Sequence, residues 1–330
     1  MAKPAITIIG LGLTGASLGQ ALQRQESEFE IIGHDRDPQA AQAARKSGAV
    51  HRTEWNLHAS CENSDLIITA VPLAELDELY GQIAEDIKPG CLVFGIVSLV
   101  EPAIAIGDRH VPDHAHFVAG HPVLSGVGGA LTTRADLFDD VVFSIASGTH
   151  TDASAIQLAA DFVTRIGATP LFVDALEHDG IMAGVEQLPQ LLGASLMHMS
   201  AAAPGWREAR RMAGRQFAQA TELGGSAEQL AGSFRANRQH LLYRLRRMQE
   251  ELERWADLLE SEPAEGEDDA LLTALIGIED ERIEWEAHAR LKNWEESASS
   301  SQSRESGEPG MLRQMFFGNM FGRRPPSGRR

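Results

Sequence analysis

Residues Gly10-Leu-Gly12-Leu-Thr-Gly15 follow an apolar run, Ala5–Gly10, and open a stretch with helical spacing, Thr14–Arg24. In a dinucleotide-binding βαβ unit, the first glycine permits the tight turn and the second lets a pyrophosphate approach the backbone. The third glycine allows the helix to pack closely on the strand. The pattern therefore predicts a dinucleotide-binding turn between the first strand and the first helix.

Asp35 follows the second apolar run, Glu30–His34, about 20 residues after the last glycine. A carboxylate at this place accepts hydrogen bonds from the adenosine ribose hydroxyls and repels a 2′-phosphate, so we expect NAD as the cofactor. Arg36 beside it leaves NADP open. The amides of the first helical turn, at Leu13 and Thr14, are expected to donate to the phosphates.

Short apolar and β-branched runs alternate with stretches of helical length through the first half of the chain. The expected strands are Ala5–Gly10, Glu30–His34, Leu66–Val71, Cys91–Val97, His116–Ala119 and Val141–Ala146. Between them lie helical stretches such as Pro38–Ser47 and Leu73–Ile87. This alternation predicts an α/β fold with a Rossmann-type, doubly wound parallel sheet that helices cover on both faces.

The second half of the chain is expected to be all helix. Its helical stretches are Leu176–Ala203, Arg207–Leu223, Ala227–Leu259 and Ala270–Trp294. The first of these is apolar nearly all round, which predicts a central helix that a second subunit helps to cover, and hence a homodimer. We therefore expect a cofactor domain over 1–173, a helical substrate and dimerisation domain over 174–296, and a serine-rich disordered tail over 297–330.

Composition excludes several classes of partner. A formal net charge of −18 repels nucleic-acid phosphates and anionic lipid, and the chain has no apolar run long enough to span a membrane. Its two cysteines, Cys61 and Cys91, form no disulfide framework, which fits the reducing cytoplasm. His110, His114 and His116 lie close together but match no common zinc pattern, so no metal site is expected.

Candidate ligand-binding residues follow three of the expected strands, where open parallel sheets place their ligands. Val71-Pro72 follows one strand and Ser98 another, although the proline could simply end its strand and the serine could simply cap a helix. His121, in Gly120-His-Pro122, follows a third. A neutral imidazole there can take a proton while hydride leaves the same carbon, so His121 is the candidate catalytic base for a small-molecule substrate.

Taken together, the chain resembles the prephenate/arogenate dehydrogenase family of tyrosine biosynthesis from Ile6 to about Leu245. Besides the glycine turn, the shared motifs are Val71-Pro72-Leu73, Ser98, Gly120-His-Pro122, Ala135-Asp-Leu-Phe138, His178-Asp179, Leu188-Pro189 and Asn237. The resemblance implies NAD-dependent oxidative decarboxylation of a cyclohexadienyl acid. It also implies that His121 hydrogen-bonds the ring 4-hydroxyl, that Ser98 supports His121 and the cofactor, and that the helical domain forms the dimer.

The chain departs from the family pattern where the substrate is held. Around Ser98, Gly95 and Val100 replace the aspartate and lysine of an Asp-x-x-Ser-x-Lys pattern. Gln190 stands where the histidine after Leu-Pro is expected, and Glu222 where an arginine grips a substrate carboxylate. Both are candidate substrate residues, and Glu222 predicts weak turnover of prephenate. More generally, the polar stretch Glu186–Gln190 could line a substrate pocket or cap a helix.

Two other hypotheses stay open. A cofactor-binding regulatory or scaffold protein that has lost turnover is favoured by the changes at Val100, Gln190 and Glu222. The retained Ser98 and His121 oppose it. A dehydrogenase that acts on a different small acid is the second hypothesis. A β-hydroxyacid type, however, would need a lysine in its helical domain, and Leu176–Ala203 contains none.

Overall fold

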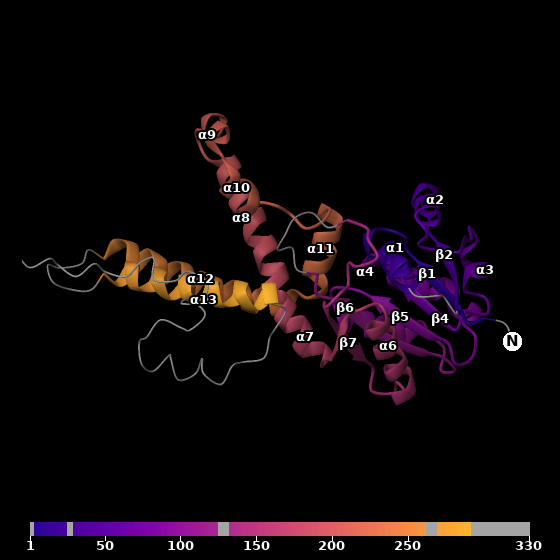
Figure 1. Cartoon of the computed structure of the whole chain (residues 1–330). Helices are drawn as coiled ribbons and strands as arrows, with labels where there is room; N and C mark the ends of the chain where they lie inside the picture. Colours follow the sequence, from indigo (N-terminus) through magenta and orange to yellow (C-terminus); the bar gives the residue numbers. More distant parts are fainter. Residues whose placement is uncertain (1–2, 25–28, 125–131, 262–268, 292–330) are drawn as a thin grey trace, which may run out of the picture. The chain divides into compact units, whose positions relative to one another are not determined.

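The computed structural model describes residues 3–24, 29–124, 132–261 and 269–291 (Figure 1). The predicted disordered tail, 297–330, lies outside the described residues. The chain divides into two compact units, Met1–Met248 and Gln249–Arg330. The first unit contains the sheet and most of the helices.

Eight strands form one sheet within the described residues, in the order β3-β2-β1-β4-β5-β6-β7-β8. They are β1 (Ala5–Ile9), β2 (Glu30–His34), β3 (Arg52–Thr53), β4 (Leu66–Thr69), β5 (Leu92–Ile96), β6 (His116–Pro122), β7 (Val142–Ser147) and β8 (Thr169–Phe172). The strand order reverses direction at β1 and β4, which is where doubly wound sheets place their ligands. The predicted Rossmann-type sheet followed by a helical region is confirmed.

One detail of the predicted sheet is wrong, because β7 runs antiparallel to β6 while the other neighbouring strands are parallel. A parallel pair needs a crossover, usually a helix, and the described residues between β6 and β7 contain none. Two observed strands are not among those expected: β3, whose two residues are too short to show a period, and β8.

Helices cover both faces of the sheet: α1 (Leu13–Leu22), α2 (Pro38–Lys46), α3 (Leu57–Cys61), α4 (Leu73–Ile83), α5 (Val100–His110) and α6 (Ala153–Arg165). A short 3-10 turn, η1 (Ala84–Asp86), follows α4. Neighbouring residues of β5 show the alternation, since Phe94 packs into the core beneath α1 and α6 whereas Val93 packs beneath α4 and α5. The central strands β1, β4, β5 and β6 are therefore buried on both sides, as a doubly wound sheet requires, whereas the edge strand β8 is largely exposed.

The helical region begins with α7 (Ala175–Met182), a π-helical segment η2 (Ala183–Gln187) and α8 (Leu188–Ala202). It continues with α9 (Trp206–Met212), α10 (Arg215–Ala220), α11 (Ala227–Ala236), α12 (Arg238–Glu260) and α13 (Ala270–Leu291). The wide η2 turn comes just before Pro189, which cannot donate a helical hydrogen bond. The predicted domain boundary at 173/174 lies between β8 and α7, inside the first unit, and stays a prediction. Among the described residues, no helix has the length and apolar character needed to cross a membrane.

Candidate active site

Each of the three glycines in the turn between β1 and α1 occupies a different steric environment. Gly10 has a φ angle of +88°, in the left-handed region, and a Cβ there would lie 2.5 Å from the Ala70 carbonyl oxygen. A Cβ on Gly15 would lie 1.8 Å from the Gly10 carbonyl oxygen, so only glycine lets α1 pack this closely. Gly12, the N-cap of α1, has open space where a side chain would stand. The turn therefore fits a pyrophosphate, which can approach Gly12 and the unpaired amides of the first helical turn.

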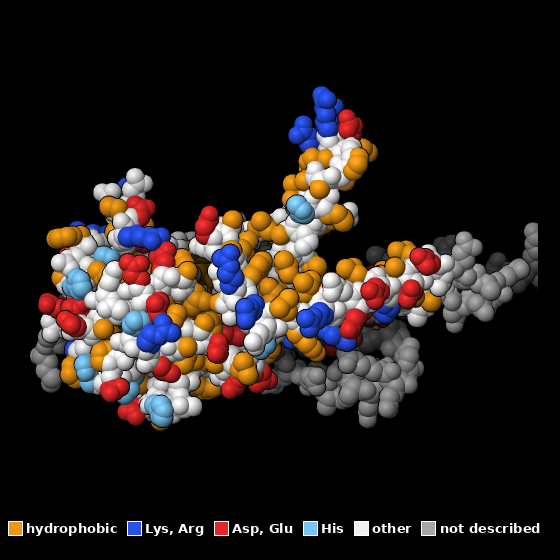
Figure 2. Space-filling model, turned by 180° about the vertical axis from the view of Figure 1, so that it is seen from behind, with side chains coloured by type: hydrophobic (Ala, Val, Ile, Leu, Met, Phe, Trp, Pro, Cys, Tyr) orange, Lys and Arg blue, Asp and Glu red, His pale blue; other side chains and the backbone are white. Residues whose placement is uncertain are grey.

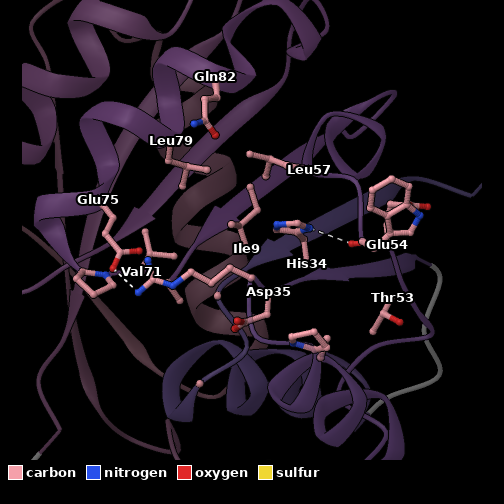
Figure 3. A pocket seen from close by; sticks show the side chains of 18 of the residues that line it. Ile9, His34, Asp35, Thr53, Glu54, Leu57, Val71, Glu75, Leu79 and Gln82 are labelled. Carbon is pink, nitrogen blue, oxygen red and sulfur yellow. Dashed lines mark hydrogen bonds and ion pairs between the residues drawn. The ribbon is translucent and has the colours of Figure 1, made fainter.

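A cleft of about 1180 Å³ opens beside this turn, at the carboxyl ends of β1, β2 and β4 (Figure 3). Most of the predicted cofactor residues line it: Gly10, Gly12, Asp35, Arg36, Val71 and Pro72. Leu13 and Thr14 begin α1 and are partly exposed, whereas Gly15 is buried between the helix and the turn. The structure thus gathers these residues at one place, and their contacts with a cofactor remain a prediction.

The Asp35 carboxylate links the glycine turn to the start of α2. Its Oδ2 atom accepts a hydrogen bond from the Leu11 amide (2.7 Å), and Oδ1 accepts one from the Asp37 amide (2.8 Å). A carboxylate has about four acceptor sites, so Asp35 can still accept from ribose hydroxyls. The backbone therefore fixes this carboxylate in the cleft before any ligand binds.

Arg36 is held by a residue that the sequence analysis did not single out. Its Nη2 atom lies 2.8 Å from Oε1 of Glu75, in the first turn of α4 (Figure 3). Another unpredicted lining residue is Trp55, which is 87% exposed and suited to stacking on a heteroaromatic ring. Both were missed because neither belongs to a motif, and Trp55 follows the two-residue strand β3.

His121 ends a chain of buried polar groups. Its Nδ1 atom lies 3.2 Å from Nε2 of His178, and Nδ1 of His178 lies 2.8 Å from Oδ1 of Asp179. Burial lowers the pKa of His121 to about 4; a charge on His178 lowers it further, and Asp179 opposes the shift. The imidazole is therefore neutral at physiological pH and available as a proton acceptor.

Ser98 lies next to His121 in the sheet, because Ile96 pairs with Gly120 and the Val97 amide donates to the Gly120 carbonyl (2.9 Å). Its side chain makes no hydrogen bond to another residue in the described part of the chain. The structure thus brings Ser98 and His121 to neighbouring strand ends. The residue that directly contacts the His121 ring is His178.

Two departures from the family pattern have structural explanations. A Cβ on Gly95 would lie 3.0 Å from the Tyr80 hydroxyl, so the tyrosine occupies the space that an aspartate would need. That hydroxyl lies 2.7 Å from Oγ1 of Thr69, which satisfies it inside the core. Val100 is fully buried as the first residue of α5, so its side chain does not face the cleft.

The substrate candidates lie on the helical region. Gln190 touches the loop after α10, where a Cβ on Gly224 would meet its Nε2 atom at 2.7 Å. Glu222, in the same loop, is exposed, and no contact joins it to His121 in the described residues. Glu186, on η2, is half-buried; burial raises its pKa, and a charge on the nearby His178 opposes that shift. Glu186 is therefore an acidic group near His178, and it belongs to the polar stretch Glu186–Gln190 that was expected to line a substrate pocket or cap a helix.

Comparisons with known proteins identify the family of this chain. A family model described as the prephenate dehydrogenase nucleotide-binding domain matches residues 18–171, and the prephenate dehydrogenase dimerization domain matches residues 174–275. The chain belongs to the prephenate dehydrogenase family. The resemblance drawn from its motifs is thereby confirmed, and the second match covers the helical region that carries His178 and Asp179.

Individual members of the prephenate dehydrogenase family align with only part of this chain. It is 25% identical over 200 residues to the prephenate dehydrogenase of Bacillus subtilis, covering 60% of this chain and 54% of that one. It is 29% identical over 198 residues to the enzyme of Lactococcus lactis, covering 59% and 53%. The chain therefore spans about half the length of the curated relatives it matches.

The fold is also that of a solved family member. The crystal structure of a prephenate dehydrogenase from A. aeolicus, in complex with hydroxyphenyl propionate and NAD+, matches with a TM-score of 0.70 at 15% identity. The match covers 88% of this chain and 98% of that one. At this level of identity the likeness shows a shared fold of sheet and helical region.

Proposed function

We propose that this protein is an NAD-dependent dehydrogenase that oxidises a cyclohexadienyl acid, prephenate or arogenate, with loss of carbon dioxide. The observation that carries the proposal is His121, a neutral histidine at the end of β6 whose Nδ1 atom is engaged by His178. Its Nε2 atom is left to meet a ligand. Membership of the prephenate dehydrogenase family and the glycine turn supply the cofactor side of the argument.

The reaction follows from the position of that base. Nε2 of His121 takes the proton of the substrate 4-hydroxyl, which turns the C4–O bond into a carbonyl as the C4 hydrogen departs with its electron pair. Bound NAD supplies the hydride acceptor. The resulting dienone loses its ring carboxyl group as carbon dioxide, and the released electron pair makes the ring aromatic. His121 then returns its proton to the phenolate oxygen, so the residue is regenerated.

Measuring NADH formation on prephenate, arogenate and a series of β-hydroxyacids tests this proposal. NADH is expected only with the cyclohexadienyl acids. Turnover of a β-hydroxyacid instead would support the hypothesis of a dehydrogenase acting on a different acid. Tight NAD binding without any turnover would support the regulatory or scaffold protein.

We expect NAD to bind at least about tenfold more tightly than NADP, a difference of ~1.4 kcal/mol. The backbone amides hold the Asp35 carboxylate in the cleft, where it repels a 2′-phosphate, and Glu75 already occupies Arg36. Quenching of tryptophan fluorescence reports both dissociation constants, because Trp55 lines the cleft. Tighter NADP binding would show that Arg36 leaves Glu75 for the phosphate.

Freeing Arg36 should shift this preference. Glu75→Gln is expected to strengthen NADP binding by a few-fold, since an exposed ion pair contributes only ~0.2–1 kcal/mol. Glu78→Gln removes a charge from the same helix and cleft without breaking the Arg36 pair, and serves as the matched control. Equal effects of the two variants would mean that net charge, not Arg36, sets the preference.

We propose that the protein is a homodimer assembled through its helical region. The dimerization-domain match covers this region, and apolar side chains there are exposed on a single chain, including Val185 (67%), Met197 (39%) and Met199 (65%). Figure 2 shows hydrophobic side chains along the helix arm that α8 forms. Burying such a surface between subunits removes it from water.

Light scattering is expected to give twice the mass of the chain. Met199→Glu should weaken the dimer, because it places a charge in the proposed interface. Leu158→Glu, at an exposed leucine on α6, is the matched control and should leave the mass unchanged. A monomer of the parent protein at micromolar concentration would contradict the proposal.

We also propose a cytoplasmic location. Cys61 and Cys91 are both buried and unpaired. Burial raises the pKa of Cys61 to about 11 and that of Cys91 to about 12. Both thiols therefore stay protonated, which fits a reducing compartment.

A further inference from the structure

We propose that His178 and Asp179 are positioning residues that fix the tautomer of His121, with its proton on Nδ1 and its Nε2 atom free to accept the substrate proton. This inference rests on the proposed function and adds to it two residues that never touch the substrate. Three side chains carry it, joined end to end by the two contacts of 3.2 Å and 2.8 Å described above.

The chain of contacts starts from a firmly held carboxylate. Oδ1 of Asp179 accepts a hydrogen bond from the Val100 amide (3.0 Å), and Oδ2 accepts one from the Glu101 amide (3.1 Å). These are the first two residues of α5, whose own N-cap residue, Leu99, makes no side-chain cap. Asp179 therefore caps α5 from a distant part of the chain, and the partial positive charge of the helix N-terminus favours a carboxylate there.

The carboxylate dictates where the protons lie. Asp179 Oδ1 faces Nδ1 of His178, and an ionised carboxylate only accepts, so a neutral His178 carries its proton on Nδ1. Its Nε2 atom is then an acceptor, and the neighbouring Nδ1 of His121 must be the donor. A neutral His121 with its proton on Nδ1 has an unprotonated Nε2 atom. The geometry thus selects the tautomer that a base at this position needs.

The same contacts stabilise the charge that the reaction creates. When His121 accepts a proton it becomes a cation in a buried site, which burial alone disfavours. His178 can share that charge through the Nδ1–Nε2 hydrogen bond, and Asp179 lies next in line to balance it. Glu186 is a further ionisable group near His178, and its negative form acts in the same direction.

A second network keeps Asp179 in place through its backbone. Nδ2 of Asn237 donates to the Asp179 carbonyl (2.8 Å) and to Oε1 of Gln187 (2.9 Å). Nε2 of Gln187 donates in turn to the Ser233 hydroxyl (2.7 Å). His178, Asp179, Gln187 and Asn237 are all buried, so water does not compete for these hydrogen bonds. The pair is therefore rigidly tied to the end of α11.

The test is the tautomer of His121, observed by NMR in protein labelled with ¹⁵N-histidine and assigned by loss of its signals in His121→Asn. In the parent protein at neutral pH, His121 is expected to carry its proton on Nδ1. In His178→Phe, which keeps a ring but removes both nitrogens, the proton should move to Nε2. His150→Phe, at an exposed histidine after β7, is the matched control and should change nothing. A proton on Nε2 in the parent, or an unchanged tautomer in His178→Phe, would overturn the proposal.

Kinetics supply a second, independent measurement. His178→Phe is expected to lower kcat by about 10–100-fold, the usual effect of losing a group that orients a functional histidine, with KM and NAD affinity changed less than about threefold. His178→Gln can accept from His121 and donate to Asp179, so it should restore the Nδ1 proton and part of the lost kcat. A rise in KM with kcat unchanged would make His178 a substrate contact and refute a positioning role.

These measurements separate the two proposals. If the parent protein turns over no cyclohexadienyl acid, the proposed function fails, yet the NMR result still decides whether His178 sets the tautomer. Thermal unfolding of each variant shows whether it is folded. If His178→Phe does not fold, Asp179→Asn removes the charge that orients His178 and should likewise release the Nδ1 proton of His121.

Discussion

His121→Asn is expected to lower kcat by about 10²–10⁴-fold, the contribution of a positioned acid-base group. Asparagine cannot take the substrate proton, but it preserves a polar group of similar size at the end of β6. NAD affinity should stay the same, because the cleft that includes Asp35 and the glycine turn does not include His121. His150→Asn is the matched control. A variant as active as the parent would remove His121 from the mechanism.

The pH dependence of the parent enzyme provides a further check on His121. Because burial lowers its pKa to about 4, the imidazole is already neutral well below physiological pH. The acid limb of kcat/KM that belongs to this base is therefore expected near pH 4 and not near the ordinary value of about 6.5. A limb near pH 6.5 that disappears in His121→Asn would contradict the buried, neutral state.

The lowered pKa of His121 should also make the free energy of unfolding depend on pH. Between about pH 6.5 and pH 4, the unfolded chain binds a proton that the folded His121 does not. The free energy of unfolding must therefore decrease as the pH falls through this window, and His121→Asn should flatten the decrease. Urea unfolding at several pH values measures both slopes.

Arogenate is expected to be turned over about 30-fold to a few thousand-fold more efficiently than prephenate, as judged by kcat/KM. Prephenate and arogenate both have two carboxylates, but arogenate also has an ammonium group in place of the side-chain keto group of prephenate. The described part of the site places a half-buried carboxylate, Glu186, beside His178, and Glu222 replaces the expected arginine. Losing the partner of a buried charge costs ~2–5 kcal/mol of binding free energy. That cost corresponds to the expected difference in kcat/KM of about 30-fold to a few thousand-fold.

The structure indicates that Glu186, and not Glu222, has the larger effect on the preference for arogenate. Glu222 is exposed in the loop after α10, so water screens its charge, while Glu186 is half-buried. Glu186→Gln is therefore expected to lower kcat/KM for arogenate more than Glu222→Gln does. Glu177→Gln, at an exposed position on α7, is the control.

Glu222→Arg should raise kcat/KM for prephenate by restoring a cation for its carboxylate. Steady-state kinetics with both acids decides the matter. If the parent already handles prephenate efficiently and neither glutamate variant alters the ratio, another residue holds the acid and the charge argument is wrong.

Local sequence was sufficient for the cofactor side of the molecule. The glycine turn could be predicted because Gly10 and Gly15 satisfy steric conditions set by residues nearby in the sheet, and Asp35 hydrogen-bonds back to that same turn. The direction of β7 was not predictable, because it depends on a connection and not on the pattern of the strand itself.

The substrate side depends on contacts between distant residues. His121 meets His178 from 57 positions away, and Asp179 caps α5 from 79 positions away, so no local pattern reports either contact. The resemblance identified His178-Asp179 as a motif without giving it a role. The polarity of Glu186–Gln190 already indicated a pocket lining or a helix cap, and the structure singles out Glu186, which is half-buried on η2 near His178.

The capping of α5 by Asp179 limits how the substrate pocket can open. Asp179 is a residue of α7, and its carboxylate accepts from the first two amides of α5. Moving α7 away from α5 would therefore break two charge-assisted hydrogen bonds, each worth ~1.5–3 kcal/mol. It would uncouple His178 as well. Substrate entry and product release are therefore expected to leave the α5–α7 contact closed, with this junction acting as a fixed pivot while other segments of the helical region move.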